Sequence, residues 1–236
     1  MSRLLFIKTG YVIPGIPAEL GDFEHWTAAA AGLPLERCHV VPVIDGERLP
    51  VARDYSGVVI SGSAAMVTSR EPWSEYTADW LRETVESGVP MLGICYGHQL
   101  LAQALGGRVD YHPGGREMGT TWIHTAPAAQ QDELFAAMPS RFPAQVTHMQ
   151  SVLGLPRGAE VLAWSSFEAH HAVRFASRVW GLQFHPEFTP LGMWHYLRLR
   201  SEALRREGQD PEALMAAVQS TDAASALLRR FVTLER

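Results

Sequence analysis

Residues 93–97 read Gly-Ile-Cys-Tyr-Gly, which places Cys95 midway between two glycines. The residues before it, 90–94, are mostly apolar and strand-like, and a helical pattern follows over residues 97–105. A small residue two positions before and after a nucleophile is typical of a sharp strand-to-helix turn. The N-terminus of a helix also favours a thiolate, because its free N–H groups and its dipole attract negative charge. We therefore interpret Cys95 as a nucleophile and the N–H of Tyr96 as one oxyanion donor.

A second strand-like run, residues 181–187 (GLQFHPE), ends in a histidine and a glutamate. Residues two apart in an extended segment point the same way, and a proline favours extended backbone at the residue before it. Glu187 can therefore lie beside His185 and fix the tautomer and orientation of its imidazole. A nucleophilic thiolate needs such a base. The alternative is a histidine that ends a strand beside a solvated glutamate, and the turn around Cys95 argues against it.

The loop Ser61-Gly62-Ser63 follows the apolar run 57–60 and is a candidate for the second oxyanion donor. A glycine there lets backbone N–H groups point into a site. An ordinary turn is the alternative for this motif taken by itself.

These residues require a scaffold that brings the ends of strands together. Apolar runs at 3–8, 38–44, 57–60 and 90–94 alternate with helical patterns at 23–33, 71–87 and 97–105. Such alternation predicts βαβ units and a parallel sheet, with ligands at the strand ends. After residue 106 the turns between short strand patterns are too short for crossover helices, which predicts added antiparallel strands. These patterns cover residues 109–111, 120–124, 145–149, 160–164, 172–175 and 179–184.

The chain beyond residue 190 has a helical pattern that is broken around residues 208–211. We expect residues 1–190 to form one domain and residues 191–236 to form a helical extension packed on it. Four arginines of the extension are expected on a solvated face. They are Arg198, Arg200, Arg205 and Arg206.

The composition of the 236 residues is that of an ordinary globular protein, with 47% hydrophobic and 19% charged residues. A net charge of −5 gives no basic face for nucleic acid. No apolar run is long enough to cross a membrane and no export signal is evident, so we expect a cytoplasmic protein. Two distant cysteines do not predict a disulfide framework. We interpret Cys38, which lacks the context of Cys95, as a core residue.

Taken together, the motifs resemble those of the class I glutamine amidotransferase family. The resemblance runs to about Thr189 and rests on GICYGHQL, Leu105-Gly106-Gly107, REMG at residues 116–119, Thr147-His148 and GLQFHPEFT. Amidotransferase subunits of the GMP synthase type and stand-alone γ-glutamyl peptidases look most similar. The resemblance implies a flavodoxin-like, doubly wound, mostly parallel α/β sheet with added antiparallel strands.

The resemblance also implies a mechanism. Cys95, His185 and Glu187 would form a catalytic triad that hydrolyses the γ-carboxamide of glutamine, or a related γ-glutamyl amide, through a γ-glutamyl thioester. The N–H groups of Gly62 and Tyr96 would hold the oxyanion, next to Ser63. Gln99 and the backbone around Thr147, His148 and Met149 would contact the α-amino and α-carboxylate groups. No metal or other cofactor is expected.

Two departures from the family pattern stand out. Ser61-Gly62-Ser63 replaces the Gly-Gly-Pro that many synthetase families carry. Gln150 follows His148-Met149 where many relatives have an aspartate, so the contact made by that aspartate is in doubt here. His148 itself is interpreted as a structural histidine.

Three functions remain open from the sequence. The chain could be a glutaminase subunit that passes ammonia to a separate synthetase, since no G-x-x-x-x-G-K-[ST] motif for ATP is present. It could be a stand-alone γ-glutamyl peptidase or hydrolase of small peptides. A non-catalytic regulatory module is the third, and the intact Cys95, His185 and Glu187 argue against it.

Overall fold

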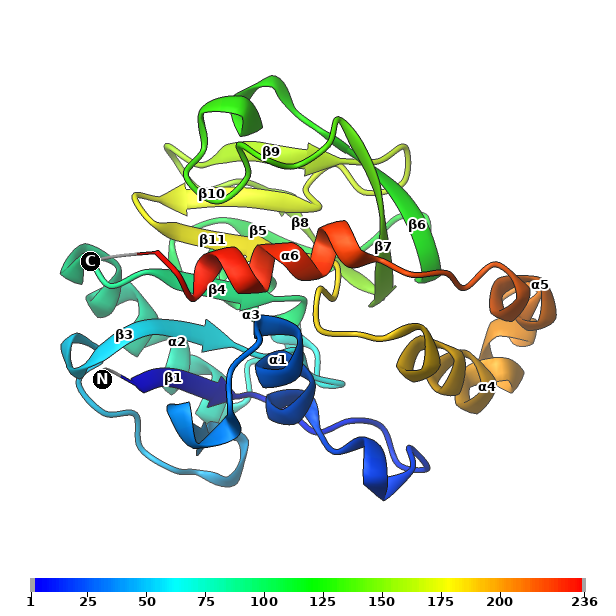
Figure 1. The fold of residues 1–236 in the computed structure, drawn as a ribbon, viewed down its shortest axis with the longest axis horizontal. Coiled ribbons are helices and arrows are strands. Elements are labelled where there is room, and N and C mark those ends of the chain that lie inside the picture. Colours follow the sequence, from blue (N-terminus) through cyan, green and yellow to red (C-terminus); the bar gives the residue numbers. More distant parts are fainter. Residues whose placement is uncertain (1–2, 235–236) are drawn as a thin grey trace.

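The computed structural model describes residues 3–234, and its centre is a nine-stranded sheet (Figure 1). The strand order is β2-β1-β3-β4-β11-β10-β9-β6-β7. Strands β2 to β11 along this order run parallel, and the four strands beyond β11 add antiparallel pairs. The strands are β1 (Arg3–Lys8), β2 (Cys38–Pro42), β3 (Tyr55–Ile60), β4 (Met91–Ile94), β6 (Glu117–Thr125), β7 (Arg141–His148), β9 (Glu160–Trp164), β10 (Ala172–Ala176) and β11 (Val179–Leu182).

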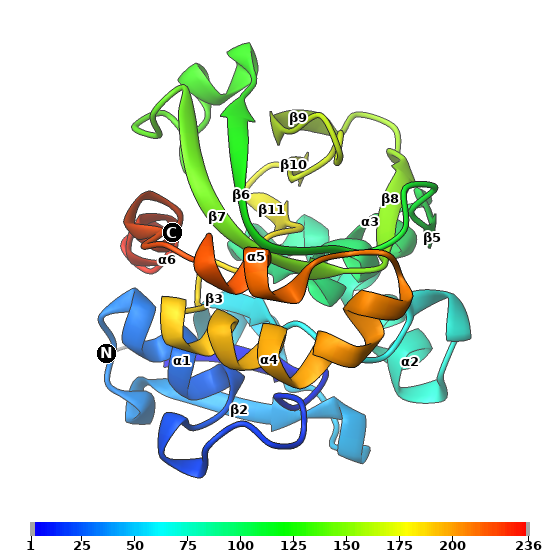
Figure 2. The same ribbon diagram turned by 90° about the vertical axis from the view of Figure 1, so that its right-hand side faces the viewer.

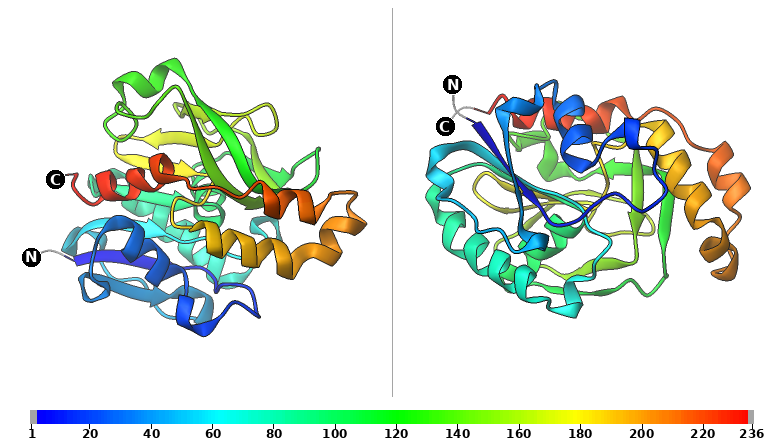
Figure 3. Two further views of the ribbon diagram at one scale, coloured as in Figure 1. Left: turned by 45° about the vertical axis from the view of Figure 1, so that its right-hand side comes forward. Right: turned by 90° about the horizontal axis from the view of Figure 1, so that it is seen from below.

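Helices cover both faces of the parallel part, as the alternating sequence pattern predicts. In the right-hand view of Figure 3, the blue and red helices lie on one side of the strands and the green helices lie on the other. The two faces carry separate apolar cores, one built with residues of α1 and α6 and the other with residues of α2 and α3. These helices are α1 (Phe23–Ala31), α2 (Pro72–Thr84), α3 (Tyr96–Ala104) and α6 (Asp222–Phe231).

Local sequence signals explain where several elements begin and end. Asp22 caps α1, and its carboxylate accepts a bond from the N–H of Phe23 at 2.7 Å. Pro42 ends β2 at the edge of the sheet, where its missing N–H costs no ladder bond. The strand is thus shorter than the expected residues 38–44, and residues Val43–Asp45 form a 3-10 turn.

One strand was missing from the sequence analysis. Residues Gln150–Gly154 form β8, which pairs with β5 (Arg108–Tyr111) in a separate two-stranded sheet. Only Met149 lies between the end of β7 and the start of β8, so no turn signal separates the two strand patterns.

The C-terminal segment contains α4 (Pro190–Arg206), α5 (Pro211–Ala216) and α6. Figures 1 and 2 show α4 and α5 in front of the carboxyl ends of the parallel strands, whereas α6 returns to pack beside α1. The division of the chain into domains at residue 190 stays a prediction. Among residues 3–234, no helix has both the length and the apolar character that crossing a membrane requires.

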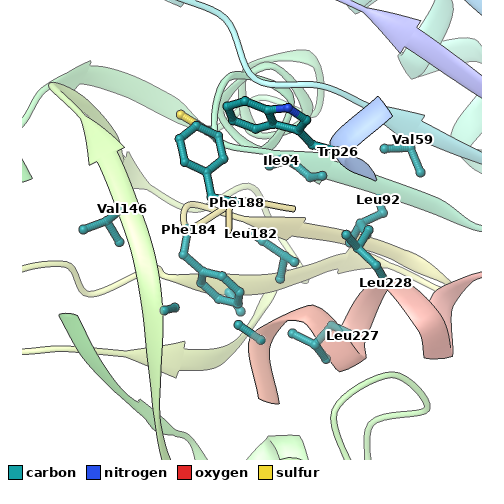
Figure 4. Packing of buried hydrophobic residues seen from close by; sticks show 14 of the residues in the cluster. Trp26, Val59, Leu92, Ile94, Val146, Leu182, Phe184, Phe188, Leu227 and Leu228 are labelled. Carbon is teal, nitrogen blue, oxygen red and sulfur yellow. The ribbon is translucent and has the colours of Figure 1, made fainter. Parts of the chain in front are cut away.

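Figure 4 shows how α6 is joined to the sheet. Leu227 and Leu228 are fully buried and belong to the same apolar cluster as Leu92 of β4 and Leu182 of β11. The far C-terminal helix is therefore part of the core beneath the strands that carry Cys95 and His185.

Candidate active site

Cys95 lies between β4 and α3 and has a backbone φ of 50°. This left-handed region is costly for a residue other than glycine and occurs mostly at functional sites. The two neighbouring glycines make the turn possible. A side chain at Gly93 would come within 2.5 Å of the backbone of Gly97, and one at Gly97 within 2.5 Å of the carbonyl oxygen of Ile60. The close approach that the sequence analysis expected of these glycines is present.

His185 and Glu187 follow β11 and are nearly inaccessible to solvent. The Nδ1 atom of His185 lies 2.7 Å from Oε1 of Glu187. Burial alone would lower the pKa of His185, but the Glu187 carboxylate and the Cys95 sulfur raise it above the ordinary imidazole value. The bond to Glu187 occupies Nδ1, which leaves Nε2 as the nitrogen that can exchange a proton with Cys95 or a substrate.

Aromatic packing fixes the plane of the His185 ring. Phe188 lies beside it, with ring centroids 4.3 Å apart. Phe188 in turn contacts Trp26 at 4.9 Å and Tyr196 at 4.8 Å, and Figure 4 shows Phe188 next to Trp26. This cluster links helices α1 and α4 to the histidine, so both helices help to position it.

A chain of amide groups leads to the sulfur of Cys95. The Nε2 atom of Gln99 donates to the carbonyl of Gln150 at 2.7 Å and to Oε1 of Gln183 at 3.0 Å. This arrangement turns the Nε2 group of Gln183 towards the Sγ atom of Cys95, 3.6 Å away. A donor at this place stabilises negative charge on the sulfur. The carbonyl of Thr147 lies 3.7 Å from the same sulfur.

The loop at Gly62 is held by Thr9, at the end of β1. The Thr9 hydroxyl donates to the carbonyl oxygens of Ser61, at 2.9 Å, and Gly62, at 3.1 Å. Because C=O and N–H point in opposite directions across a trans peptide, the N–H groups that follow these carbonyls point away from Thr9. A side chain at Gly62 would come within 3.0 Å of Cε1 of His185, so this backbone lies directly beside the histidine.

A cavity of about 240 Å³ opens in front of Cys95 and His185. Six of the other predicted site residues line it, whereas Glu187 and Gly62 are not part of the lining. The six are Ser63, Tyr96, Gln99, Thr147, His148 and Met149, and Gln150, whose role the sequence left open, lines the cavity as well. Among the described residues, no cluster of three or more His, Cys, Asp or Glu side chains is arranged to hold a metal ion.

Comparison with known proteins identifies the family. The family model described as "Glutamine amidotransferase class-I" matches residues 25–197, which is most of the chain. The chain belongs to the class I glutamine amidotransferase family.

Relatives agree with this assignment. The glutamine-hydrolyzing GMP synthase of Thermomicrobium roseum is 41% identical over 156 residues, covering 62% of this chain and 28% of the relative. The enzyme of the same name from Aeropyrum pernix is 38% identical over 142 residues, covering 60% and 25%. The chain thus spans about a quarter of the length of these relatives.

Solved structures confirm the predicted fold class. A glutamine amidotransferase from Thermotoga maritima superimposes with a TM-score of 0.77 at 23% identity, covering 98% of this chain and 96% of that one. A glutamine amidotransferase from Methylobacillus flagellatus gives 0.72 at 23% identity, covering 98% and 91%. At this level of identity the likeness concerns the fold alone.

The side chains of two predicted contact residues of the amidotransferase, His148 and Gln99, are bonded within the protein. Both ring nitrogens of His148 are bonded within the protein, to the carbonyl of Gln150 at 3.1 Å and to Glu117 at 2.9 Å. The Nε2 group of Gln99 is likewise committed to other glutamines. What His148 can offer a substrate is therefore its backbone, as part of residues 147–149.

Gln150 has a contact of its own. Its Nε2 donates to the Thr68 hydroxyl at 2.6 Å, and its Oε1 accepts from the N–H of Thr68 at 3.4 Å. The amide therefore fastens the 3-10 turn Val67–Ser69 beside the cavity. In this chain the Gln150 side chain therefore supports a loop beside the cavity.

Sequence reasoning missed several residues of the site. Gln183 had a usable signal, because it is a polar residue two positions before His185 in an apolar strand. Arg116 begins the REMG motif quoted above, but the motif assigned it no role in the site. Thr9 and Tyr196 had no signal, because they reach the site only through folding. The expectation for Arg200 is wrong: it is partly buried and lines the cavity, whereas the other three arginines of the extension are exposed. Position 200 follows the site-facing Tyr196 by one helical turn, which carries it away from the solvated face.

Proposed function

We propose that this amidotransferase hydrolyses the γ-carboxamide of glutamine, or a γ-glutamyl amide, with Cys95, His185 and Glu187 as its catalytic triad. The observation that carries the proposal is the strained backbone of Cys95 beside a buried His185–Glu187 pair at one cavity. A side chain is held in such a conformation only when the surrounding structure enforces it.

The steps follow from the positions of the groups. The Cys95 thiolate attacks the γ-carbonyl carbon, and the N–H groups of Gly62 and Tyr96 stabilise the resulting oxyanion. Protonated His185 gives its Nε2 proton to the nitrogen as the C–N bond breaks, so that ammonia or an amine leaves and a γ-glutamyl thioester remains. His185 then takes a proton from water, which attacks the thioester and releases glutamate and the Cys95 sulfur. Glu187 stabilises the imidazolium at both stages.

The amide nitrogen has two possible fates. The relatives bear the name GMP synthase, and this chain corresponds to only about a quarter of their length. A separate synthetase that takes up the ammonia would supply the remaining activity. A hydrolase that works alone would release the amine into solution.

The test incubates the purified protein with glutamine and a panel of γ-glutamyl compounds, alone and with a cell extract. We expect release of glutamate in at least one arm and a loss of at least about 10⁴-fold in Cys95→Ser. Cys38→Ser is the matched control, because Cys38 is also buried but lies at the start of β2, away from the cavity. Equal glutamate release from both variants, or none from the native protein in either arm, would leave a non-catalytic module as the better account. Release that requires extract would favour a partnered synthetase.

A further inference from the structure

The ionisable side chains of Arg, His, Asp or Glu type that line the cavity are all basic. They belong to Arg116, Arg200, His148 and His185, and no aspartate or glutamate of residues 3–234 lines it. The protein as a whole carries a net charge of −5. A cavity lined by one sign of charge concentrates ligands of the opposite sign. Glutamine itself has no net charge, so this lining favours a more acidic ligand.

The two arginines differ in their partners. Arg116 is neutralised by Glu207, to which its Nε donates at 2.8 Å and its Nη2 at 3.1 Å. Arg200 makes no hydrogen bond and no ion pair with another of residues 3–234, although it lies near enough to Glu207 to help lower the pKa of that carboxyl. Its guanidinium N–H groups therefore remain available to bind a ligand.

The position of Arg200 in the cavity indicates which part of a ligand it meets. Cys95 and Gln99 are 5% and 4% exposed, whereas Arg200 is only partly buried, on helix α4. Figure 2 shows α4 in front of the carboxyl ends of the parallel strands. During the reaction the γ-glutamyl group stays attached to Cys95 while the amine departs before water enters. The departing amine therefore lies on the outer side of the cavity, where Arg200 is.

Arg200 also lies outside the part of the chain that the family model matches, residues 25–197. When the substrate is glutamine the leaving group is ammonia, which has nothing for a guanidinium to bind. Hydrolysis of glutamine alone therefore gives no role to a cation at this place.

We propose that Arg200 binds a carboxylate on the leaving amine, so that the substrate is a γ-glutamyl derivative of an amino acid or other amino-carboxylate. This inference rests on the proposed function. A guanidinium matches a carboxylate with two parallel N–H···O bonds, and such charge-assisted bonds are roughly twice as strong as neutral ones. Arg200 is a specificity residue here and takes no part in bond breaking.

The test compares two substrates that differ only in this charge, γ-glutamylglycine and γ-glutamylglycinamide, with glutamine alongside. We expect kcat/KM to favour the free carboxylate by roughly tenfold or more. Arg200→Met should reduce this preference to less than about twofold, and Arg200→Lys should restore part of it. Arg198→Met is the matched control, because Arg198 is an exposed arginine on the same helix that does not line the cavity. It should keep the native preference.

Binding of both dipeptides to the Cys95→Ala protein, measured by calorimetry, separates this inference from the proposed function. Equal affinity for the two compounds, or a preference that survives in Cys95→Ala/Arg200→Met, overturns the role of Arg200 even if glutamate is released by Cys95. A preference that depends on Arg200 supports the inference, and the absence of any Cys95-dependent glutamate release would count against the proposed function alone.

Discussion

The two sides of the cavity are built by different means. The inner wall consists of Cys95 and His185, which follow the neighbouring parallel strands β4 and β11, and main-chain bonds hold it. The N–H of Cys95 donates to Leu182 at 2.7 Å, and the N–H of His185 donates to the carbonyl of Gln145 at 2.8 Å. These bonds survive most side-chain substitutions. The inner wall is therefore fixed by the sheet itself.

The outer wall consists of Arg116, Tyr196 and Arg200, and side chains hold it. The Tyr196 hydroxyl accepts a bond from the N–H of Ile13 at 3.2 Å, and Arg116 pairs with Glu207. These partners lie 183 and 91 residues apart in the sequence. The difference indicates that changes to the inner wall should lower kcat, whereas changes to the outer wall should act on KM and stability.

The largest effect is expected at the support of the inner wall. Glu187→Gln keeps the shape of the side chain but removes the charge that stabilises the His185 imidazolium, and we expect kcat/KM to fall by about 10²–10⁴-fold. The carboxylate raises the pKa of His185, so its removal lowers that pKa. The protonated imidazole is the acid in the first step, so activity should begin to decline at lower pH in the variant than in the native protein.

A pH–rate profile of kcat/KM checks this prediction. Glu168→Gln is the control, because Glu168 is another carboxylate with 2% exposure, and it does not line the cavity. A profile whose alkaline limb stays where it is in the native protein would show that Glu187 does not act on the histidine.

A smaller effect is expected at Gln183. Gln183→Met removes the N–H donor that lies 3.6 Å from the Cys95 sulfur while keeping a side chain of similar length. The thiolate then loses one stabilising contact, and we expect alkylation of Cys95 by iodoacetamide at neutral pH to slow by about tenfold.

Mass spectrometry of the two cysteine peptides measures this rate and includes an internal reference. Burial raises the pKa of the Cys38 thiol, so Cys38 should react slowly in every variant. Gln145→Met is the matched control, since Gln145 is fully buried and its side chain bonds Thr120 and Gln219 instead of the sulfur. Equal alkylation rates in both variants would remove Gln183 from the support of the nucleophile.

The same contrast between walls explains what the sequence could predict. Cys95, His185 and Glu187 lie in short motifs whose meaning is local: a glycine pair around a turn, and a histidine two residues before a carboxylate. The parallel strands follow from apolar runs that need no knowledge of distant partners. The fold class could therefore be predicted from the sequence.

The residues of the outer wall could not be predicted from the sequence, because no local pattern indicates which helix packs against the site. The sequence around Arg200 is typical of a solvated helix face. Arg200 lines the cavity because of where α4 lies in the folded protein. Strand β8 was missed for a related reason, since its partner β5 ends at Tyr111, far before β8 in the sequence. Contacts of this kind depend on the register of the whole sheet.

The smallest effect is expected at the ion pair between Arg116 and Glu207 in the outer wall. Glu207→Gln breaks the charged pair with Arg116, which is partly exposed, at 14% for the arginine side chain and 33% for the glutamate. After screening by solvent we expect a loss of only about 0.5 kcal/mol of unfolding free energy at neutral pH. The bond to Arg116 lowers the pKa of Glu207 below its ordinary value near 4.5. The stabilisation is therefore present above that value and is lost as the pH falls through the lowered pKa.

Urea unfolding of the native protein and of Glu207→Gln, at neutral pH and in acid, checks this prediction. The difference should be visible at neutral pH, shrink in acid, and shrink also in high salt, because salt screens exposed pairs. Glu202→Gln is the control, since Glu202 forms an ion pair with Arg206 on the same helix but both side chains are largely exposed. The kcat of Glu207→Gln should remain native, because the inner wall is untouched. A fall in kcat as large as that of Glu187→Gln would show that the outer wall also positions the catalytic groups. The proposed difference between the two walls would then be wrong.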